Sequence, residues 1–150
     1  MRIAIASSSR VALPTIEAIE NSEHELIGFI TTPDAPAGRG RALTPNEFAN
    51  WASNTGREIA KPIDFAQMTA LVVEMDPDLI ITIAYGKLIP EQLLSQVKYG
   101  WLNLHFSLLP KWRGAAPVQH AILSGDKTTG VTLFKIDEGL DTGPVVAAVP

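Results

Sequence analysis

Cysteine is missing from this chain of 150 residues, histidine occurs only three times, and no long hydrophobic run is present. Without cysteine, the chain forms no disulfide framework and no zinc site built from thiolates. Three scattered histidines do not favour a metal site made of imidazole groups alone, so we expect no metal. The first apolar run ends at polar Ser7, which is too short for a signal peptide core or a membrane span. We therefore expect a cytoplasmic protein with no membrane partner.

The overall composition is that of one ordinary globular domain. Hydrophobic residues make up 46% of the chain and charged residues 19%, which provides enough apolar side chain for a real core. The formal net charge of -4 and the pI near 5.3 argue against a surface that binds nucleic acid throughout, but they allow a local basic patch. No internal repeat, low-complexity tract or composition shift marks a second domain.

The amino-terminal third has the pattern of a β-α-β unit. Arg2–Ala6 is a short apolar run, Leu13, Ile16 and Ile19 recur at helical spacing, and Glu25–Thr31 is typical of a second strand. Such a unit predicts a mainly parallel sheet covered by helices, which is a Rossmann-like, doubly wound α/β fold. In this fold ligands bind beyond the carboxyl ends of the strands.

Capping residues mark the helices that follow. The loop from Thr32 to Thr44 would lie on the ligand-binding edge. A helix would start at Pro45 after the cap residue Thr44, with Glu47 completing a capping box. Gly56 would end this helix. The remaining predicted elements are a short strand at Glu58–Lys61, a helix capped by Asp64 and Gln67 with an apolar stripe of Phe65, Met68, Leu71, Val72 and Met75, a central strand at Leu79–Ile83, a short helix from Pro90, a strand at Trp101–His105, a helix at Pro117–Leu123, and strands at Val131–Ile136 and Val145–Val149.

Two polar residues share one face of the strand predicted at Trp101–His105. Side chains alternate along a strand, so Asn103 and His105 point the same way, opposite Leu102 and Leu104. An amide and an imidazole aimed at one point suit the stabilisation of an oxyanion. The alternative is a buried polar pair that neighbouring backbone groups satisfy.

Two unusual loops follow this strand. Ser107–Gly114 contains a proline, two cations and a glycine and is too apolar for a simple solvated linker. In Glu138–Gly143 the glycines allow close approach of the backbone, and the carboxylate of Asp141 can orient or deprotonate an imidazole. A tight turn would explain the second loop equally well, so the residues alone indicate a candidate enzyme site between Asn103 and Asp141.

At these residues the sequence resembles the folate-dependent formyltransferase family, in its amino-terminal catalytic part. The segments that carry the resemblance are AYGKLIP from Ala84, NLHFSLLPKWRGAAPVQ from Asn103, TGVTLF from Thr129 and EGLDTGPV from Glu138, in that order. A fifth segment, PDAPAGRG from Pro33, resembles a loop that the tRNA-acting members carry and the purine-pathway members lack. The resemblance therefore favours the tRNA-acting branch.

The resemblance implies a role for each matching residue. The catalytic residues would be Asn103, His105 and Asp141. The tetrahydrofolate contacts would be Ser107, Leu108, Leu109 and Pro110, together with Tyr85, Gly86 and Gly139 around the pterin ring. The tRNA contacts would be Arg39 and Arg41, for which ordinary solvated charge is the alternative.

The implied reaction moves a formyl group from 10-formyltetrahydrofolate to the free amine of methionine on initiator tRNA, for translation initiation. The nucleophile is the amine of the substrate, so no covalent enzyme intermediate is needed. Asn103 and protonated His105 would donate hydrogen bonds to the developing oxyanion. Asp141 would either keep His105 charged or take the proton that the amine loses, and the sequence does not separate these roles. We expect a monomer.

The chain also departs from the family pattern. Ser7–Val11 replaces the usual Gly-Thr-Pro after the first strand, and Phe106 replaces a small residue, which predicts a tighter pocket. Family members continue into a β-rich carboxyl-terminal domain that helps to hold tRNA, so we expect residues 1–150 to be a catalytic domain truncated at its carboxyl end, without that domain. Two rivals stay open: a formyltransferase acting on glycinamide ribonucleotide or a nucleotide sugar, and a non-catalytic folate-binding module. The lack of a GxGxxG or P-loop motif disfavours nucleotide binding.

Overall fold

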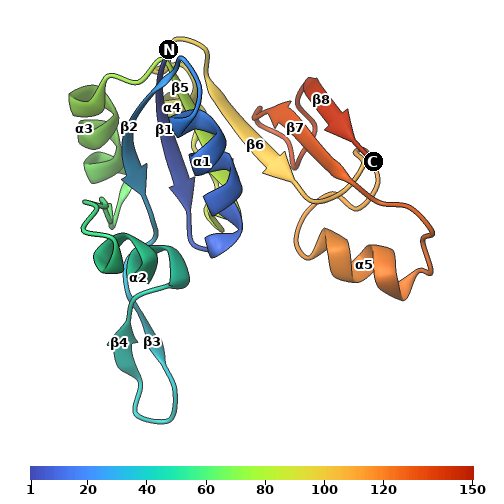
Figure 1. The fold of residues 1–150 in the computed structure, drawn as a ribbon, viewed down its shortest axis with the longest axis horizontal. Coiled ribbons are helices and arrows are strands. Elements are labelled where there is room, and N and C mark those ends of the chain that lie inside the picture. Colours follow the sequence, from blue (N-terminus) through green and yellow to red (C-terminus); the bar gives the residue numbers. More distant parts are fainter.

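A computed structural model describes all 150 residues, and its centre is a six-stranded sheet with the order β2-β1-β5-β6-β7-β8 (Figure 1). The strands are β1 (Arg2–Ser7), β2 (Glu25–Ile30), β5 (Leu79–Ile83), β6 (Trp101–His105), β7 (Val131–Lys135) and β8 (Val145–Val149). The first four are parallel to one another, whereas β7 and β8 each run antiparallel to the neighbouring strand. The predicted α/β class with a mainly parallel sheet is confirmed.

Helices cover both faces of the parallel part of the sheet. On one face, α1 (Leu13–Glu20, after a 3-10 turn) and α2 (Glu47–Asn54) pack in a core cluster with the isoleucines of β1. On the other face, α3 (Phe65–Met75) and α4 (Glu91–Leu94) pack in a second cluster with the alanines of β1. The fifth helix, α5 (Pro117–Leu123), lies beside the β7–β8 end (Figure 1). None of these helices has the length and apolarity needed to cross a membrane.

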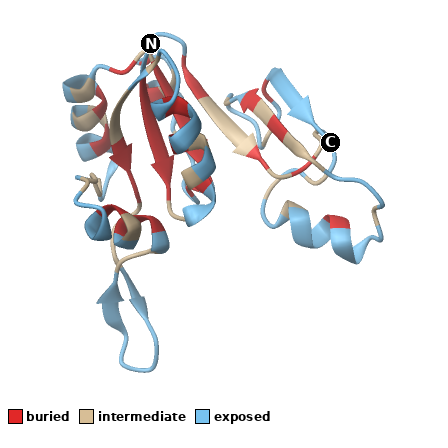
Figure 2. Cartoon of the chain, viewed as in Figure 1, coloured by how far each residue is buried: buried red, intermediate tan, exposed pale blue.

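Burial decreases from the centre of the sheet towards β8 (Figure 2). All five residues of β5 are buried, because this strand has a paired neighbour on each side and helices on both faces. All five residues of β8 are exposed, although all five are valine or alanine (VVAAV). The described domain therefore has its core around β1 and β5, and the candidate residues of β6 lie where that core gives way to solvent.

The order in which the chain adds strands switches between β1 and β5, and two serine hydroxyls form hydrogen bonds across this switch point. From β1 the chain passes outward to β2 and later returns to place β5 on the other side of β1. Ser7 Oγ donates to the carbonyl of Ile83 at 2.5 Å, and Ser8 Oγ donates to the carbonyl of Ala84 at 2.6 Å. Ser7 and Ser8 thus join the carboxyl ends of β1 and β5, which border the expected ligand crevice.

The segment predicted as a loop at Thr32–Thr44 contains a small antiparallel hairpin. Its strands are β3 (Ala35–Ala37) and β4 (Ala42–Thr44), joined by a four-residue turn. The hairpin extends away from the helices and the main sheet (Figure 1), and all its strand residues are exposed. Small exposed residues give no alternation of polar and apolar side chains, so the pattern that predicts strands is missing here.

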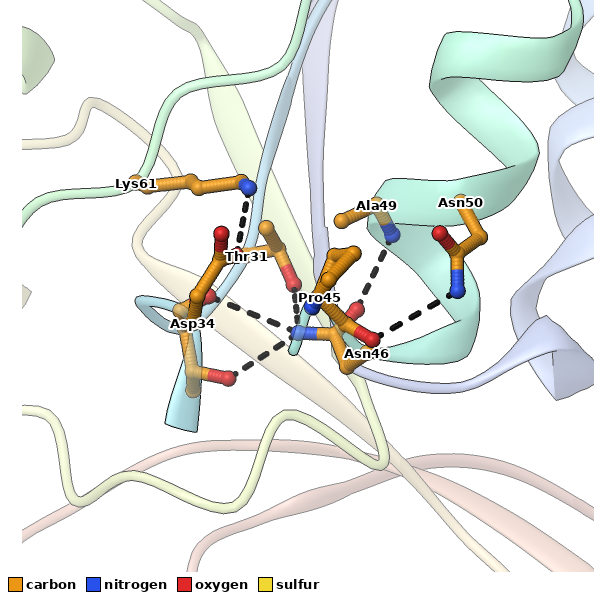
Figure 3. Close-up of polar contacts among 8 residues, drawn as sticks. Thr31, Asp34, Pro45, Asn46, Ala49, Asn50 and Lys61 are labelled. Carbon is orange, nitrogen blue, oxygen red and sulfur yellow. Dashed lines mark hydrogen bonds and ion pairs between the residues drawn. The ribbon is translucent and has the colours of Figure 1, made fainter. Parts of the chain in front are cut away.

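The predicted cap of α2 is wrong: Asn46 caps the helix, and Thr44 belongs to β4. The Asn46 side-chain oxygen accepts from the backbone N–H of Ala49 at 2.9 Å. The Asn46 amide nitrogen donates back to the Thr31 hydroxyl at 2.8 Å (Figure 3). The Asn46 side chain therefore binds both a free N–H of the first turn of α2 and Thr31, which precedes the hairpin. Thr44 forms neither of these hydrogen bonds.

Replacing Asn46 tests the helix cap separately from the hydrogen bond between Asn46 and Thr31. Asn46→Ala removes both and is expected to lower the free energy of unfolding by about 1–2 kcal/mol. Asn46→Ser keeps a capping oxygen but loses the amide donor, so its free energy of unfolding should fall by about half as much as that of Asn46→Ala. Denaturant unfolding measures both variants, and equal losses would show that Asn46 does not cap the helix.

Two more predictions are wrong in part. Glu58–Lys61 is not a strand, because only Ala60 forms a bridge, with Ile30. Asp64 caps α3 as predicted, but Phe65 is 46% exposed, so the apolar stripe of this helix is only partly core. The helix at Pro117–Leu123 and the strand at Val145–Val149 have the predicted bounds.

Candidate active site

A cavity of about 810 Å³ lies at the carboxyl ends of β5 and β6. Trp101, Asn103 and His105 share the face of β6 that looks towards α3 and α4. Trp101 is fully buried in the second core cluster, and the next two side chains on this face line the cavity. The lining residues are Thr82, Tyr85, Gly86, Lys87, Leu88, Ile89, Pro90, Glu91, Asn103, His105, Gly114, Ala115, Phe134, Ile136, Asp137, Glu138, Gly139, Leu140 and Asp141.

The cavity collects half of the twelve site residues singled out in the sequence. Asn103, His105 and Asp141 all line it, although Asp141 is 36 positions after His105 in the chain. Tyr85, Gly86 and Gly139 line it as well. No cluster of three or more histidine, aspartate or glutamate side chains is placed to hold a metal ion. Besides glycine, the polar lining residues are Thr82, Tyr85, Lys87, Glu91, Asn103, His105, Asp137, Glu138 and Asp141.

Thr82 orients the amide of Asn103, and the sequence analysis missed it. The two residues are register partners on the parallel strands β5 and β6. The Thr82 hydroxyl donates to the Asn103 side-chain oxygen at 2.8 Å. Because this bond occupies the amide oxygen, the amide nitrogen is left to donate hydrogen bonds elsewhere. No sequence signal points to Thr82, since strand register depends on long-range pairing.

His105 is buried and has a different partner at each ring nitrogen. Nε2 lies 2.8 Å from the backbone carbonyl of Trp112, and because a carbonyl only accepts, Nε2 carries a hydrogen. Nδ1 lies 3.6 Å from Oδ2 of Asp141, which is too long for a good hydrogen bond. Nδ1 is the ring nitrogen that has no hydrogen bond of its own.

Backbone turns bring Asp141 to His105. Asp141 has φ 51°, in the left-handed region, and its Oδ2 accepts from the N–H of Gly114 at 2.7 Å. Earlier in the same loop, Asp137 Oδ1 accepts from Gly139 N–H at 3.0 Å and from the Thr142 hydroxyl at 2.7 Å. A side chain on Gly139 would overlap the Thr142 hydroxyl, so glycine allows this closure. The loop therefore holds the carboxylate at a defined position.

The segment Ser107–Pro110, predicted to contact folate, does not line the cavity. Ser107 is fully buried, and its hydroxyl donates to the carbonyl of Lys111 at 2.6 Å. Thr132 on β7 donates to the carbonyl of Ser107 at 2.7 Å and accepts from the N–H of Leu109 at 3.1 Å. In this structure the segment fastens the loop after β6 to β7, and its contact with folate stays a prediction.

Three other predicted features lie away from the cavity. Arg39 and Arg41 are exposed on the turn of the β3–β4 hairpin, and neither forms an ion pair. Phe106 packs against the first core cluster, behind the sheet as seen from the cavity. The expectation that Phe106 narrows the pocket is wrong, because strand alternation turns it away from His105.

The sequence model of the formyl transferase family matches residues 1–149. The chain belongs to the formyl transferase family. This confirms the family resemblance drawn from the sequence. Among curated relatives, methionyl-tRNA formyltransferase of Salinispora tropica is 47% identical over 99% of this chain and 49% of its own length. That of Thermobifida fusca is 48% identical, with the same coverage.

The formyl transferase fold is also found among solved structures. Phosphoribosylglycinamide formyltransferase from Bacillus halodurans superposes with a TM-score of 0.79 at 24% identity, covering 99% of this chain and 78% of that one. A 4-N formyltransferase from Francisella tularensis gives 0.70 at 23% identity, covering 99% and 55%. These identities show a shared fold alone. This chain spans about half the length of the curated relatives that it matches.

Proposed function

We propose that this chain transfers a formyl group from 10-formyltetrahydrofolate to the free amino group of methionyl initiator tRNA, for translation initiation. The observation that carries the proposal is the meeting of Asn103, His105 and Asp141 at one cavity. The curated relatives at 47% and 48% identity, named methionyl-tRNA formyltransferase, support the choice of acceptor. The cytoplasmic location and the monomeric state stay predictions.

The cavity fits a folate-sized molecule. Its volume of about 810 Å³ is within the range of roughly 300–1,000 Å³ that is usual for small-molecule sites. Its wall combines apolar side chains such as Leu88 and Ile89 with glycines at positions 86 and 139, where backbone can approach a flat ring. The formyl donor supplies the electrophilic carbonyl carbon of the reaction.

The side chains divide the chemistry between them. Thr82 turns the Asn103 amide so that its nitrogen can donate to the oxygen on which negative charge develops. When both ring nitrogens carry a hydrogen, His105 Nδ1 can donate to the same oxygen, because Nε2 donates to the Trp112 carbonyl. Asp141, held by the Gly114 N–H, either keeps the His105 ring protonated or takes the proton of the attacking amine. No covalent bond to the protein is required.

The β3–β4 hairpin is the proposed contact for tRNA. Arg39 and Arg41 present two cations without an acidic partner on a turn that extends from the body (Figure 1). Phosphate contacts of this kind would help to position the acceptor end of tRNA rather than take part in the chemistry. The Lys61–Asp34 ion pair at 2.5 Å and the hydrogen bond from Asn46 to Thr31 hold the base of the hairpin (Figure 3).

Acceptor choice tests the proposal directly. The chain is supplied with labelled formyltetrahydrofolate and, in separate reactions, with methionyl initiator tRNA, glycinamide ribonucleotide or an amino sugar. We expect label on the tRNA alone. Label on another amine would replace the acceptor, and folate binding without transfer to any amine would favour a non-catalytic binding module.

Thr82→Val tests the orientation of Asn103. Valine has nearly the shape of threonine but lacks the hydroxyl, so Asn103 loses the bond that fixes its amide. We expect kcat to fall about tenfold, the equivalent of one lost hydrogen bond, with KM for the folate within about twofold. Thr82→Ser should recover most of the activity, and equal kcat in the serine and valine variants would rule out the hydroxyl as the orienting group.

A further inference from the structure

A network outside the cavity holds the carbonyl that orients His105. Its centre is Asp126, which follows α5 and does not line the cavity. Asp126 Oδ1 lies 2.6 Å from Nζ of Lys111, and Oδ2 accepts from the indole N–H of Trp112 at 2.7 Å. The carboxylate thus uses one oxygen for each of two neighbouring residues of the loop after β6.

The Trp112 side chain is held on its edge and on its face. Its indole N–H is bound by Asp126, and the ring of His120 on α5 stacks on it with centroids 5.6 Å apart and an angle of 11° between planes. Lys111 Nζ lies 5.3 Å from the centroid of the same indole. Asp126 is therefore one part of a packed cluster that joins α5 to the loop after β6.

The backbone of Trp112 needs this support. Its φ of 60° is in the left-handed region, which costs a non-glycine residue roughly 1–2 kcal/mol. The residue persists in such a conformation only when surrounding contacts hold it. In this conformation the Trp112 carbonyl accepts from Nε2 of His105 at 2.8 Å. Contacts to the side chain of Trp112 consequently determine where the ring of His105 is held.

We propose that Asp126 is a positioning residue for formyl transfer: by binding the side chains of Lys111 and Trp112, it fixes the carbonyl that orients His105. This inference rests on the proposed function of the same site. The Asp126 side chain is only 13% exposed, unlike Lys111 at 57%, so the carboxylate is set into the cluster while the lysine reaches it from solvent. The hydrogen bonds from Lys111 and Trp112 also lower the pKa of the Asp126 carboxyl, in keeping with a charged anchor.

Substitutions at Asp126 separate positioning from simple stability. Asp126→Ala removes both bonds, Asp126→Asn keeps one oxygen acceptor, and Trp112→Phe keeps the backbone carbonyl and an aromatic ring but lacks the indole N–H. Glu20→Ala is the matched control, because Glu20 also pairs with a cation, Arg57 at 2.5 Å, on α1 far along the sheet from the cavity. Two readouts are measured: kcat and KM for formyl transfer, and the Nε2 proton resonance of His105 in histidine-labelled protein.

We expect Asp126→Ala and Trp112→Phe to lower kcat about tenfold, with KM for the folate within about twofold, and to shift or broaden the His105 resonance. Asp126→Asn should fall between these variants and the wild type, and Glu20→Ala should change neither readout. An unchanged kcat together with an unchanged resonance would overturn the proposal, and so would a lower kcat with the resonance unchanged. The resonance requires no acceptor, so failure of the proposed function is distinguishable from failure of this inference.

Discussion

His105→Ala is expected to lower kcat/KM for formyl transfer about 100- to 10,000-fold, the usual range for losing a positioned acid-base group. The ring is the buried link between the Trp112 carbonyl at 2.8 Å and the Asp141 carboxylate at 3.6 Å, and alanine replaces neither contact. The affinity for tetrahydrofolate should stay within about twofold, because most of the cavity wall comes from other residues. Steady-state kinetics and a folate titration measure the two quantities.

A second histidine provides the control for this prediction. His24 lies in the turn before β2, outside the cavity, and its Nδ1 has no hydrogen-bond partner. His24→Ala should therefore leave both quantities unchanged. Equal turnover of the His105 variant and the wild type would reject the proposed mechanism, and a parallel loss of folate affinity would instead make His105 part of the binding wall.

Asp141→Asn is expected to lower kcat by about 100-fold or more while the fold is retained. Asparagine has nearly the same shape, tolerates the left-handed backbone at φ 51°, and keeps an oxygen for the Gly114 N–H. It loses the negative charge beside His105 and the capacity to take a proton. The kinetic constants and the thermal midpoint are measured together, so that a catalytic loss is separated from unfolding.

Asp76→Asn is the matched control for the charge at Asp141. Asp76 is also an aspartate in the left-handed region, with φ 46°, but it ends α3 and does not line the cavity. The Asp76 variant should keep full activity. An active Asp141→Asn variant would show that neither the charge nor the proton transfer assigned to this residue is needed.

The elements that the sequence predicted well depend on local patterns. The Leu79–Ile83 strand is apolar except for Thr82, and it lies between two strands and two helical layers. Asn103 and His105 share a face because side chains alternate on any strand, whatever its neighbours are. The Asp64 cap also depends on residues close in the chain. The grouping of Asn103, His105 and Asp141 as catalytic residues is a prediction from the family resemblance, since alternation alone does not connect His105 to Asp141.

Predictions failed where a distant partner competes with a local one. Thr44 fits a capping box by spacing, but Asn46 both caps α2 and reaches Thr31 of the preceding arm. The hairpin that contains Thr44 has no apolar periodicity from which to infer it. Phe106 directly follows His105 in the chain, yet it packs on the opposite side of the sheet.

By itself the sequence determined the α/β class, most of the strands and helices, the face shared by Asn103 and His105, and the formyl transferase family. Only the tertiary structure decided which atoms complete the site. Thr82 reaches Asn103 through strand register, Asp141 approaches His105 through a loop closed by hydrogen bonds, and Asp126 acts on His105 through the backbone of Trp112. Each of these contacts joins residues that no periodic pattern relates, because hydrogen-bond partners across a fold are set by three-dimensional packing and not by spacing along the chain.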